Sequence, residues 1–491
     1  MTHKKQEWER ESGYIWSMIG SAVGFANVLA FSARCYQNGG GAFLIPFVVA
    51  LLLLGLPMLI MEGIIGQKFH FPLVSAYGLV AGRLGKVFGW LSILGVVTIG
   101  TFYAVLTGYS VAYIYYTAAG AIPQDTALFF KEAVLQDSGS ILNWGSLSVP
   151  VLGATLVVLV FSWFVLVRNI HQGVERVCSV FLPLLTALVV IFAVVVCFLP
   201  GAFDGFVAFL KPDFERLKSV SLWRDMFGHL FFSLSLSLGL IVGYSRHTNK
   251  HTNIPRAMFW VAFGDFAISF ISGLAIFGCI GYMSHRSGIA FNDIIHTESP
   301  FEIGFIIFPT ILQTFGPTLS ALIGPLFFFC VFIAGVTGLF SILEAFSGNI
   351  EVEFGRSRRW AVTFSCVFLM LFALTFCMGN GQYIIDALAP AVLGNNMLLT
   401  GIAEVFIFMF FAHKIKDHEV WYSHYPRRNF FYYSLKYFSL GVLMVIFYHS
   451  LVAELSLGFT LESFLRWTWF IAALIIALVL SQRGKVQTPS E

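Results

Sequence analysis

The sequence predicts an all-α membrane protein with about twelve transmembrane helices. Of the 491 residues, 58% are hydrophobic and only 11% are charged, a balance outside the range of soluble domains. The mean hydropathy is +0.82. Charged loops divide the chain into apolar stretches, each near the roughly 20 residues that a helix needs to cross a bilayer. The chain therefore has lipid as its solvent.

The apolar stretches follow one another along the whole chain, and no hydrophilic domain separates them. They begin near residues 13, 41, 88, 147, 174, 223, 255, 318, 360, 383, 431 and 464. One membrane domain accounts for this pattern, with short segments at 1–12 and 483–491 outside it.

Lysine and arginine residues gather in every second loop, which predicts the orientation of the chain. The cation-rich loops are expected in the cytoplasm and contain Lys4, Lys5 and Arg10, then Arg83 and Lys86, Arg168 and Arg176, Arg246, Lys250 and Arg256, Arg356, Arg358 and Arg359, Lys414, Lys416, Arg427 and Arg428, and Arg483 and Lys485. The loops near 119–146, 201–222 and 284–317 contain few cations and are expected outside. Both termini are therefore predicted to be cytoplasmic. The short external loops and termini fit a prokaryote, so the inner (plasma) membrane of a bacterium is the expected location.

Charge and cysteine usage exclude several classes of function. The net charge of +3 follows from the sidedness of the loops and predicts no nucleic-acid partner. The seven cysteines lie singly in or beside apolar spans, without metal spacing, and are expected to be packing residues. A membrane enzyme would need a metal or nucleophile constellation, and none has the required spacing. We expect neither an enzyme nor an organic cofactor.

Two spans are interrupted by small and flexible residues. The first contains Gly20-Ser-Ala-Val-Gly-Phe-Ala-Asn27, and the sixth contains Gly228-His-Leu-Phe-Phe-Ser-Leu-Ser-Leu-Ser-Leu-Gly239. At membrane depth, backbone leaves a helix only where it lines a cavity or binds a ligand. Each break alone is explained by close helix packing. The pair favours a transporter built from two inverted five-helix repeats, at 13–200 and 201–412, followed by helices 11 and 12 in 413–482.

The residues around these breaks resemble a known family. The matching residues are Trp8, the run from Gly20 to Asn27, Gln37-Asn-Gly-Gly-Gly-Ala-Phe43 with Pro46, Gly173-Val-Glu-Arg176, Phe231-Phe-Ser-Leu-Ser235 and Ala334-Gly-Val-Thr337. They are similar to the neurotransmitter:sodium symporter family and closely resemble its prokaryotic amino-acid transporters. The resemblance runs from about residue 8 to the twelfth span, and the Asn-Gly-Gly-Gly-Ala-Phe element is highly specific.

The resemblance implies an amino-acid site between the two breaks. The substrate carboxylate would rest on backbone N–H groups near Phe25 and Ala26 and on the Tyr103 hydroxyl. The positive end of a half-helix independently suits an anion. Tyr103 by itself equally fits a packing role. The groups implied for the ammonium are the carbonyls of Ala22, Phe232 and Ser233, with the hydroxyl of Ser235 nearby.

The implied side-chain pocket is uncharged. Its lining residues would be Ser21, Ile99, Tyr103, Phe232, Ser235, Leu238, Gly338 and Ile342. A charged substrate side chain would be desolvated there without a partner, at a cost of several kcal/mol. Leu238 and Gly338 are smaller than the residues that relatives often carry, whereas Ile99 takes some volume. We therefore expect neutral, bulky aliphatic or aromatic amino acids.

The resemblance also implies two sodium sites made of hard oxygen ligands. The first would use the carbonyl of Ala22 and the side chains of Asn27, Ser233 and Asp265. The second would use the carbonyls of Gly20, Val23 and Ala334, the hydroxyl of Thr337 and position 338. Many relatives have a hydroxyl residue where this chain has Gly338, so one or two sodium ions are expected.

Asp265 is an intramembrane charge, and such groups are functional by default. Animal relatives bind chloride nearby, but Phe47 and His229 stand where their tyrosine and glutamine ligands would be. Since a fixed carboxylate can replace the anion, we expect chloride independence, with Asp265 taking a proton on the return step and His229 tuning it. Asp265 with Ser269, and His229 with Ser233, share helix faces, so these four side chains are expected to converge. A hydrogen bond from His229 to a backbone carbonyl is an equal alternative.

The gates depart from the family pattern. Relatives have an external arginine where this chain has Ala30, and Asp386 in the tenth span is out of register, so no outer charge latch is expected. Closure would rest on packing of Tyr103 against Phe232. On the cytoplasmic side Lys5 replaces the usual arginine and Trp8 is kept. The plausible partners for Lys5 are Glu351 and Glu353.

Two further features of the spans are interpreted structurally. Glu62 and Glu404 lie in the second and tenth spans, and Glu62 is expected to support the unwound backbone near Gly24 and Phe25. Gly173 and Pro183 in the fifth span would allow local unwinding for release of the inner sodium. Both residue types are common in membrane helices, which weakens this inference.

The predicted function is sodium-coupled import of neutral hydrophobic amino acids by alternating access. A proton-coupled carrier or a non-transporting amino-acid sensor on the same scaffold is the alternative, because missing gate charges are compatible with lost coupling. The expected partners are a small-molecule amino acid and membrane lipid, with the chain a monomer or dimer.

Overall fold

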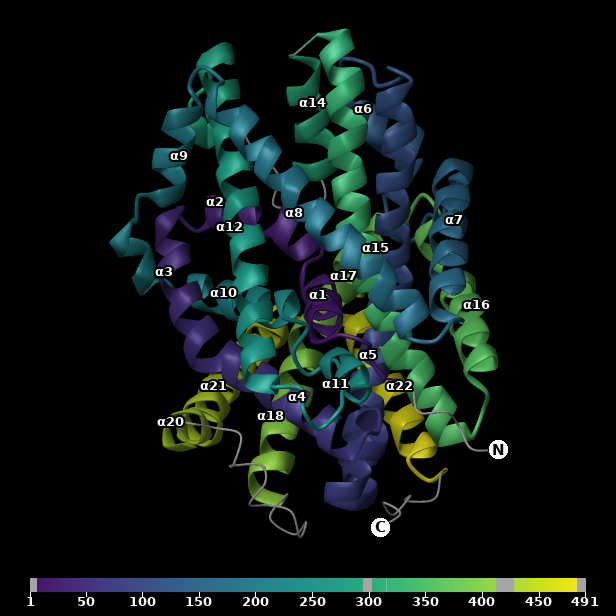
Figure 1. The fold of residues 1–491 in the computed structure, drawn as a ribbon. Helices are drawn as coiled ribbons and strands as arrows, with labels where there is room; N and C mark the ends of the chain where they lie inside the picture. Colours follow the sequence, from purple (N-terminus) through teal and green to yellow (C-terminus); the bar gives the residue numbers. More distant parts are fainter. Residues whose placement is uncertain (1–6, 295–302, 315, 412–427, 484–491) are drawn as a thin grey trace.

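A computed structural model describes residues 7–294, 303–314, 316–411 and 428–483, which form a bundle of helices (Figure 1). Within this part of the chain, ten helices are long and apolar enough to cross a membrane. A further span is the pair Glu11–Ala22 and Ala26–Gln37, bent by 56° at a short break. The predicted all-α membrane fold is confirmed.

The α-helices are α1 (Glu11–Ala22), α2 (Phe31–Gln37), α3 (Gly41–Ala50), α4 (Leu56–Phe69), α5 (Leu73–Ala118), α6 (Thr126–Leu128), α7 (Val149–Leu166), α8 (Arg176–Cys197), α9 (Ala202–Leu210), α10 (Val220–Ser233), α11 (Leu240–Ser245), α12 (Ile254–Ser287), α14 (Phe308–Gln313), α15 (Pro317–Phe354), α16 (Arg358–Phe376), α17 (Gly381–Ala389), α18 (Met397–Phe406), α20 (Arg428–Tyr433), α21 (Leu440–Ser456) and α22 (Leu461–Leu480). Short π-helical turns extend several of them, including η1 (Ala26–Ala30), η2 (Leu51–Gly55) between α3 and α4, and η4 (His171–Glu175) before α8.

The loops expected outside the membrane share one end of the bundle. They contain α6, α9 and α14, which all lie at the top of Figure 1. We call this the upper end, and the opposite end the lower end. At the centre, α5 packs along α15, and α15 contacts α1 of the first broken span and α11 of the sixth.

The third span, expected to begin near residue 88, is preceded by a helical segment that was not predicted. α5 begins at Leu73 and reverses at Gly82, where φ is 62° and ψ is −137°. A residue with a Cβ atom rarely adopts this conformation, so glycine permits the kink. Residues 73–81 therefore form a separate short helix before the span.

The first span breaks where the sequence predicts. α1 ends at Ala22, and Val23 is extended with φ −76° and ψ 109°. The Asn27 side chain stabilises the break, because its Oδ1 atom accepts a hydrogen bond from the Gly24 N–H at 2.9 Å. The next half-helix starts at Ala26 and runs toward the upper end.

The sixth span breaks between Ser233 and Leu240. Ser235, Ser237 and Gly239 have positive φ values of 55°, 61° and 72°. Each non-glycine residue in this region costs about 1–3 kcal/mol and needs support from its surroundings. The Glu62 carboxylate accepts a hydrogen bond from the Ser237 N–H at 2.8 Å, and the Ser92 hydroxyl donates to the Ser237 carbonyl at 2.6 Å.

This contact corrects one expectation. Glu62 supports the unwound backbone of the sixth span at Ser237, and not that of the first span near Gly24. Glu404 of α18 lies beside Glu62 and close to the Ser237 hydroxyl.

The cysteine prediction also needs one change, since six of the seven are buried but Cys197 at the end of α8 is exposed.

Candidate functional site

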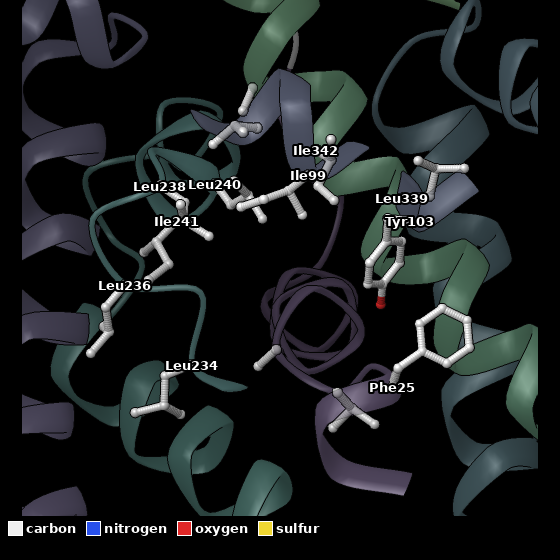
Figure 2. Close-up of a cluster of buried hydrophobic side chains, with 14 of the residues drawn as sticks. Phe25, Ile99, Tyr103, Leu234, Leu236, Leu238, Leu240, Ile241, Leu339 and Ile342 are labelled. Carbon is white, nitrogen blue, oxygen red and sulfur yellow. The ribbon is translucent and has the colours of Figure 1, made fainter. Parts of the chain in front are cut away.

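A cavity of about 390 Å³ lies where the two broken spans face each other. α5 and α15 complete its wall, and no charged residue lines it. Figure 2 shows Leu238, Ile99 and Ile342 on one part of the wall, and Tyr103 with Phe25 on another.

The structure brings the predicted pocket residues together. All eight side-chain positions proposed from the sequence line the cavity, namely Ser21, Ile99, Tyr103, Phe232, Ser235, Leu238, Gly338 and Ile342. Their role in binding stays a prediction. Val96, Leu240 and Gly24 also line the cavity and were missed. Val96 was within reach of sequence reasoning, because it lies three residues before Ile99 on the same helix face.

Tyr103 is held between the break and α15. Its ring packs on Phe25 with centroids 5.0 Å apart, and its hydroxyl bonds to the Phe25 backbone. The expected packing of Tyr103 on Phe232 is not among the ring contacts of the described residues, although both residues line the cavity. The ring of Phe25 takes that place because the break turns it toward Tyr103 (Figure 2).

Two glycines make room for the Tyr103 hydroxyl. A Cβ atom at Gly24 would lie 2.4 Å from it, and one at Gly338 would lie 2.6 Å from it. Both distances are shorter than any normal contact. The tyrosine hydroxyl can therefore reach the break only because both positions lack a side chain.

Four oxygen atoms converge on the Asn27 amide next to this cavity. Its Nδ2 atom lies 3.0 Å from Ser233 Oγ, 2.8 Å from Ser269 Oγ, and 2.6 Å and 3.3 Å from the Asp265 Oδ1 and carbonyl oxygens. The Ser233 hydroxyl also contacts Asp265 Oδ1 and Oδ2 at 2.9 and 3.1 Å. All four side chains are fully buried. Such hard oxygen donors suit a small cation, with the Asn27 amide oxygen as a fifth ligand after rotation of the amide.

His229 does not join this oxygen cluster. Its ring lies among Phe31, Phe43 and Phe47, with centroids 5.5, 6.2 and 5.9 Å away. Its Nε2 atom has no hydrogen-bond partner in the described part of the chain. The expected convergence of four side chains is therefore wrong for His229, because it lies one turn before Ser233 on α10, at the level of Phe31, Phe43 and Phe47.

The groups proposed for a second ion lie where α1 meets α15. The Thr337 hydroxyl is 2.9 Å from the Ile333 carbonyl and 3.4 Å from the Ala334 carbonyl. Gly20 lies so close that a Cβ atom there would be 3.1 Å from Thr337 Cβ. The end of α1 and this turn of α15 are thus in direct contact.

At the upper end, an ion pair lies one turn beyond the position where the external arginine is missing. Arg34 Nη1 is 3.7 Å from Asp225 Oδ2 of α10. Asp386 instead accepts a hydrogen bond from Gln382 at 3.1 Å. The upper end therefore has a weak, partly exposed charge contact between the first and sixth spans.

Trp8 closes the lower end. Its Nε1–H donates to the Tyr244 carbonyl at 3.0 Å, and its ring packs on Tyr14 and Tyr244. Lys5 lies outside the described residues. Of its proposed partners, Glu353 binds Lys86 at 2.7 Å, and Glu351 lies 3.9 Å from Arg246.

A buried ion cluster at the lower end was not predicted. Glu344 accepts Arg246 at 3.0 Å and Arg358 at 2.8 Å, which joins the end of α11 to α15 and α16. Burial, followed by the adjacent Arg246 guanidinium, lowers the pKa of His247. Its Nε2 atom lies 3.1 Å from Arg246 Nε and 3.2 Å from Glu344 Oε1.

Glu175 holds the N-terminal segment, a role that sequence reasoning missed. Its carboxylate accepts hydrogen bonds from the backbone N–H groups of Glu9 at 2.9 Å and Arg10 at 3.1 Å. His171 bridges the carboxylates of Glu9 and Glu175 at 2.9 and 3.2 Å. Gly13 permits this approach, since a Cβ atom there would lie 2.1 Å from Glu175 Oε1. The sequence gives no signal for this contact, because the partners of Glu175 are backbone N–H groups and any residue type supplies those.

Glu175→Ala is expected to release the N-terminal segment. Hydrogen bonds to a charged group contribute about 1.5–3 kcal/mol, so local opening should increase roughly 10- to 100-fold. Hydrogen–deuterium exchange of residues 7–14 measures this opening. Glu132→Ala, at an exposed position of the upper end, is the matched control and should change nothing there. Unchanged exchange in the Glu175 variant would show that Trp8 alone holds the segment.

Comparisons with known proteins agree with this geometry. The sequence model of the sodium:neurotransmitter symporter family matches residues 5–127 and 117–486. A sodium-dependent transporter of Methanocaldococcus jannaschii is 30% identical over 420 residues, 84% of each chain. The sodium-dependent dopamine transporter of Caenorhabditis elegans is 26% identical over 84% of this chain and 75% of its own. Among solved structures, MhsT in complex with L-phenylalanine aligns with a TM-score of 0.79 over 91% of this chain and 99% of its own, at 22% identity, which shows a shared fold.

Proposed function

The chain belongs to the sodium:neurotransmitter symporter family, and on this premise we propose that it imports neutral, hydrophobic amino acids together with sodium by alternating access. Its relatives are sodium-dependent transporters and not enzymes. The single observation that carries the proposal is the uncharged cavity between the two breaks, placed directly beside the oxygen cluster around Asn27.

A zwitterion fits the two ends of this cavity. The carboxylate is proposed to bind at the start of the half-helix at Ala26, where the helix dipole is positive, and at the Tyr103 hydroxyl. The ammonium is proposed to bind carbonyl oxygens at the end of α1 and of α10, with the Ser235 hydroxyl nearby. In the structure that hydroxyl donates to the Ser21 carbonyl at 3.1 Å, so it already lies between the two broken spans.

The rest of the cavity favours a large apolar side chain. Leu238, Ile99 and Ile342 contribute only hydrocarbon to its wall. A charged side chain would be buried without a counter-charge, at a cost of several kcal/mol. L-phenylalanine, the ligand of MhsT, belongs to the favoured class.

The Asn27 cluster is proposed as the first sodium site, with Ser233, Asp265 and the Ala22 carbonyl as its other ligands. Asp265 supplies a fixed negative charge beside the ion, so transport should need no chloride. Support comes from the space around His229, which three phenylalanine rings already fill. The second site, at Gly20, Val23, Ala334 and Thr337 beside Gly338, is proposed as well.

The lower end is proposed to face the cytoplasm, as the cation-rich loops indicate. Release of substrate then requires the contacts of Trp8 with Tyr244 and of Glu175 with the N-terminal segment to break. The π-helical start of α8 at His171–Glu175 is a favourable place for this motion. Gly173 permits a close backbone crossing there, since a Cβ atom would lie 2.0 Å from the Val165 carbonyl.

Uptake of labelled leucine, phenylalanine and tryptophan into proteoliposomes tests the proposal. We expect accumulation above equilibrium with an inward sodium gradient, none with potassium or choline, and no change when gluconate replaces chloride. Accumulation driven by a proton gradient without sodium would instead show a proton-coupled carrier. Saturable binding without accumulation would show a sensor.

A further inference from the structure

A second, larger cavity lies away from the proposed substrate site. It has a volume of about 680 Å³ and is enclosed by α8, α12, α15 and the first span at Val28. No charged residue lines it, and among its lining residues only Ser272 carries a hydroxyl. The cavity shares no lining residue with the substrate pocket, so it requires a separate explanation.

The mouth of this cavity opens sideways toward lipid. Ile191 is 58% exposed, Val195 40% and Leu326 47%, and all three line the cavity. They lie in the spans His171–Cys197 and Pro317–Phe354, which are among the most apolar of the chain. Exposure within such a span means contact with hydrocarbon. A ligand that enters here must therefore dissolve in the bilayer and carry no charge.

The inner wall has one unsatisfied polar group. Ser272 is only 4% exposed, and its hydroxyl has no hydrogen-bond partner in the described part of the chain. Other α12 hydroxyls are bonded, as Ser269 is to the Asp265 carbonyl at 2.9 Å and Ser287 is to the Met283 carbonyl at 2.8 Å. A buried unpaired hydroxyl costs about 1–3 kcal/mol, which a ligand with one hydrogen-bonding group would relieve.

The cavity also adjoins the oxygen cluster. Val28 directly follows Asn27, and Ser272 lies three residues after Ser269, one turn further along the same face of α12. A ligand between these walls would hold the upper half of the first span against α12. Movement of either element would then disturb the positions of Asn27 and Ser269.

We propose that this cavity is a second binding site, which takes an uncharged and largely apolar amphiphile from the bilayer and hydrogen-bonds its one polar group at Ser272. A long-chain primary alcohol has this chemistry. Occupation of the site restrains the first span and α12 together and slows the transport cycle. The site is separate from the substrate pocket, and its binding is measurable whether or not the chain transports.

Photolabelling tests the site directly. The full chain in proteoliposomes is irradiated with a diazirine analogue of hexadecanol, and labelled peptides are mapped by mass spectrometry. We expect labelling of α8, α12 and α15 at the cavity, displaced by hexadecanol at a roughly two- to tenfold lower membrane mole fraction than by hexadecane. Equal displacement by the alkane would overturn the proposal, because it would show a cavity filled by any hydrocarbon, including lipid tails.

Two variants sharpen the test. Ser272→Ala should weaken competition by hexadecanol two- to tenfold and leave hexadecane unchanged, whereas Ser287→Ala, with an exposed hydroxyl on the same helix, should change neither. Ala275→Leu fills part of the cavity and should reduce labelling by the diazirine probe. Labelling that persists at full strength in both cavity variants would place the site elsewhere. A failure of sodium-driven uptake would leave these results intact and would bear only on the proposed function.

Discussion

Replacing Asp265 with asparagine is expected to lower sodium-driven uptake roughly 100-fold or more. Asp265 is the only ionisable member of the oxygen cluster around Asn27, and it is fully buried. Removing one member of a buried charge pair costs about 3–5 kcal/mol, because the remaining charge is left uncompensated in a low dielectric. The remaining charge here would be the sodium ion itself. Initial rates of labelled phenylalanine uptake at several sodium concentrations measure the effect.

Chloride should not rescue the Asp265 variant. The place where an anion would bind is occupied by Phe31, Phe43 and Phe47 around His229. Asp204→Asn makes the same chemical change at an exposed position of α9 and is the matched control. Uptake restored by chloride would show that the anion can take the place of the Asp265 carboxylate. It would also show that the aromatic rings around His229 do not block an anion. Normal uptake by the Asp265 variant in the absence of chloride would show that Asp265 is not a sodium ligand.

Gly338→Val is expected to weaken phenylalanine binding roughly 10- to 100-fold. A Cβ atom at this position would lie 2.6 Å from the Tyr103 hydroxyl, so Tyr103 must move off the Phe25 backbone to which it bonds. The two added methyl groups also occupy space in the cavity. Overpacking of this kind costs about 1–3 kcal/mol before the loss of the carboxylate contact is counted.

Equilibrium binding of labelled phenylalanine in detergent measures the Gly338 effect without the transport cycle. Gly153→Val on α7 is the control, because a Cβ atom there meets nothing within 4 Å. The control should bind phenylalanine as the original chain does, within experimental error. Unchanged binding in the Gly338 variant would place the substrate outside this cavity.

Much of the architecture could be predicted because it depends on local composition. The span predicted to start near 41 begins at Gly41, the one near 318 at Pro317 and the one near 464 at Leu461. The two breaks were predicted from small residues alone, since a helix can lose its hydrogen bonds at membrane depth only where something compensates. The short helix at residues 73–81 before the third span was missed, because the reversal at Gly82 depends on a positive φ angle that the apolar pattern does not signal.

The candidate site was predicted mostly through the family resemblance. The predictions that proved wrong concern which residues are in contact. Spacing alone placed His229 and Ser233 on one helix face, but it could not say that His229 meets phenylalanine rings while Ser233 meets Asp265. Glu62 was expected to support the break in the first span, but it supports the break in the sixth span. Each error has the same origin, since a periodic pattern specifies the face of a helix but not its neighbour.

By itself, the sequence determined that the chain is a membrane protein, which segments span the membrane, and where two of these spans break. These properties follow from hydropathy and from glycine, which act over a few residues. Only the tertiary structure decided that Glu175 holds backbone of the N-terminal segment, that Phe25 packs on Tyr103, and that Ser272 lines the second cavity. Such contacts join residues far apart in the chain, and they depend on the distance and rotation between packed helices, which no local pattern encodes.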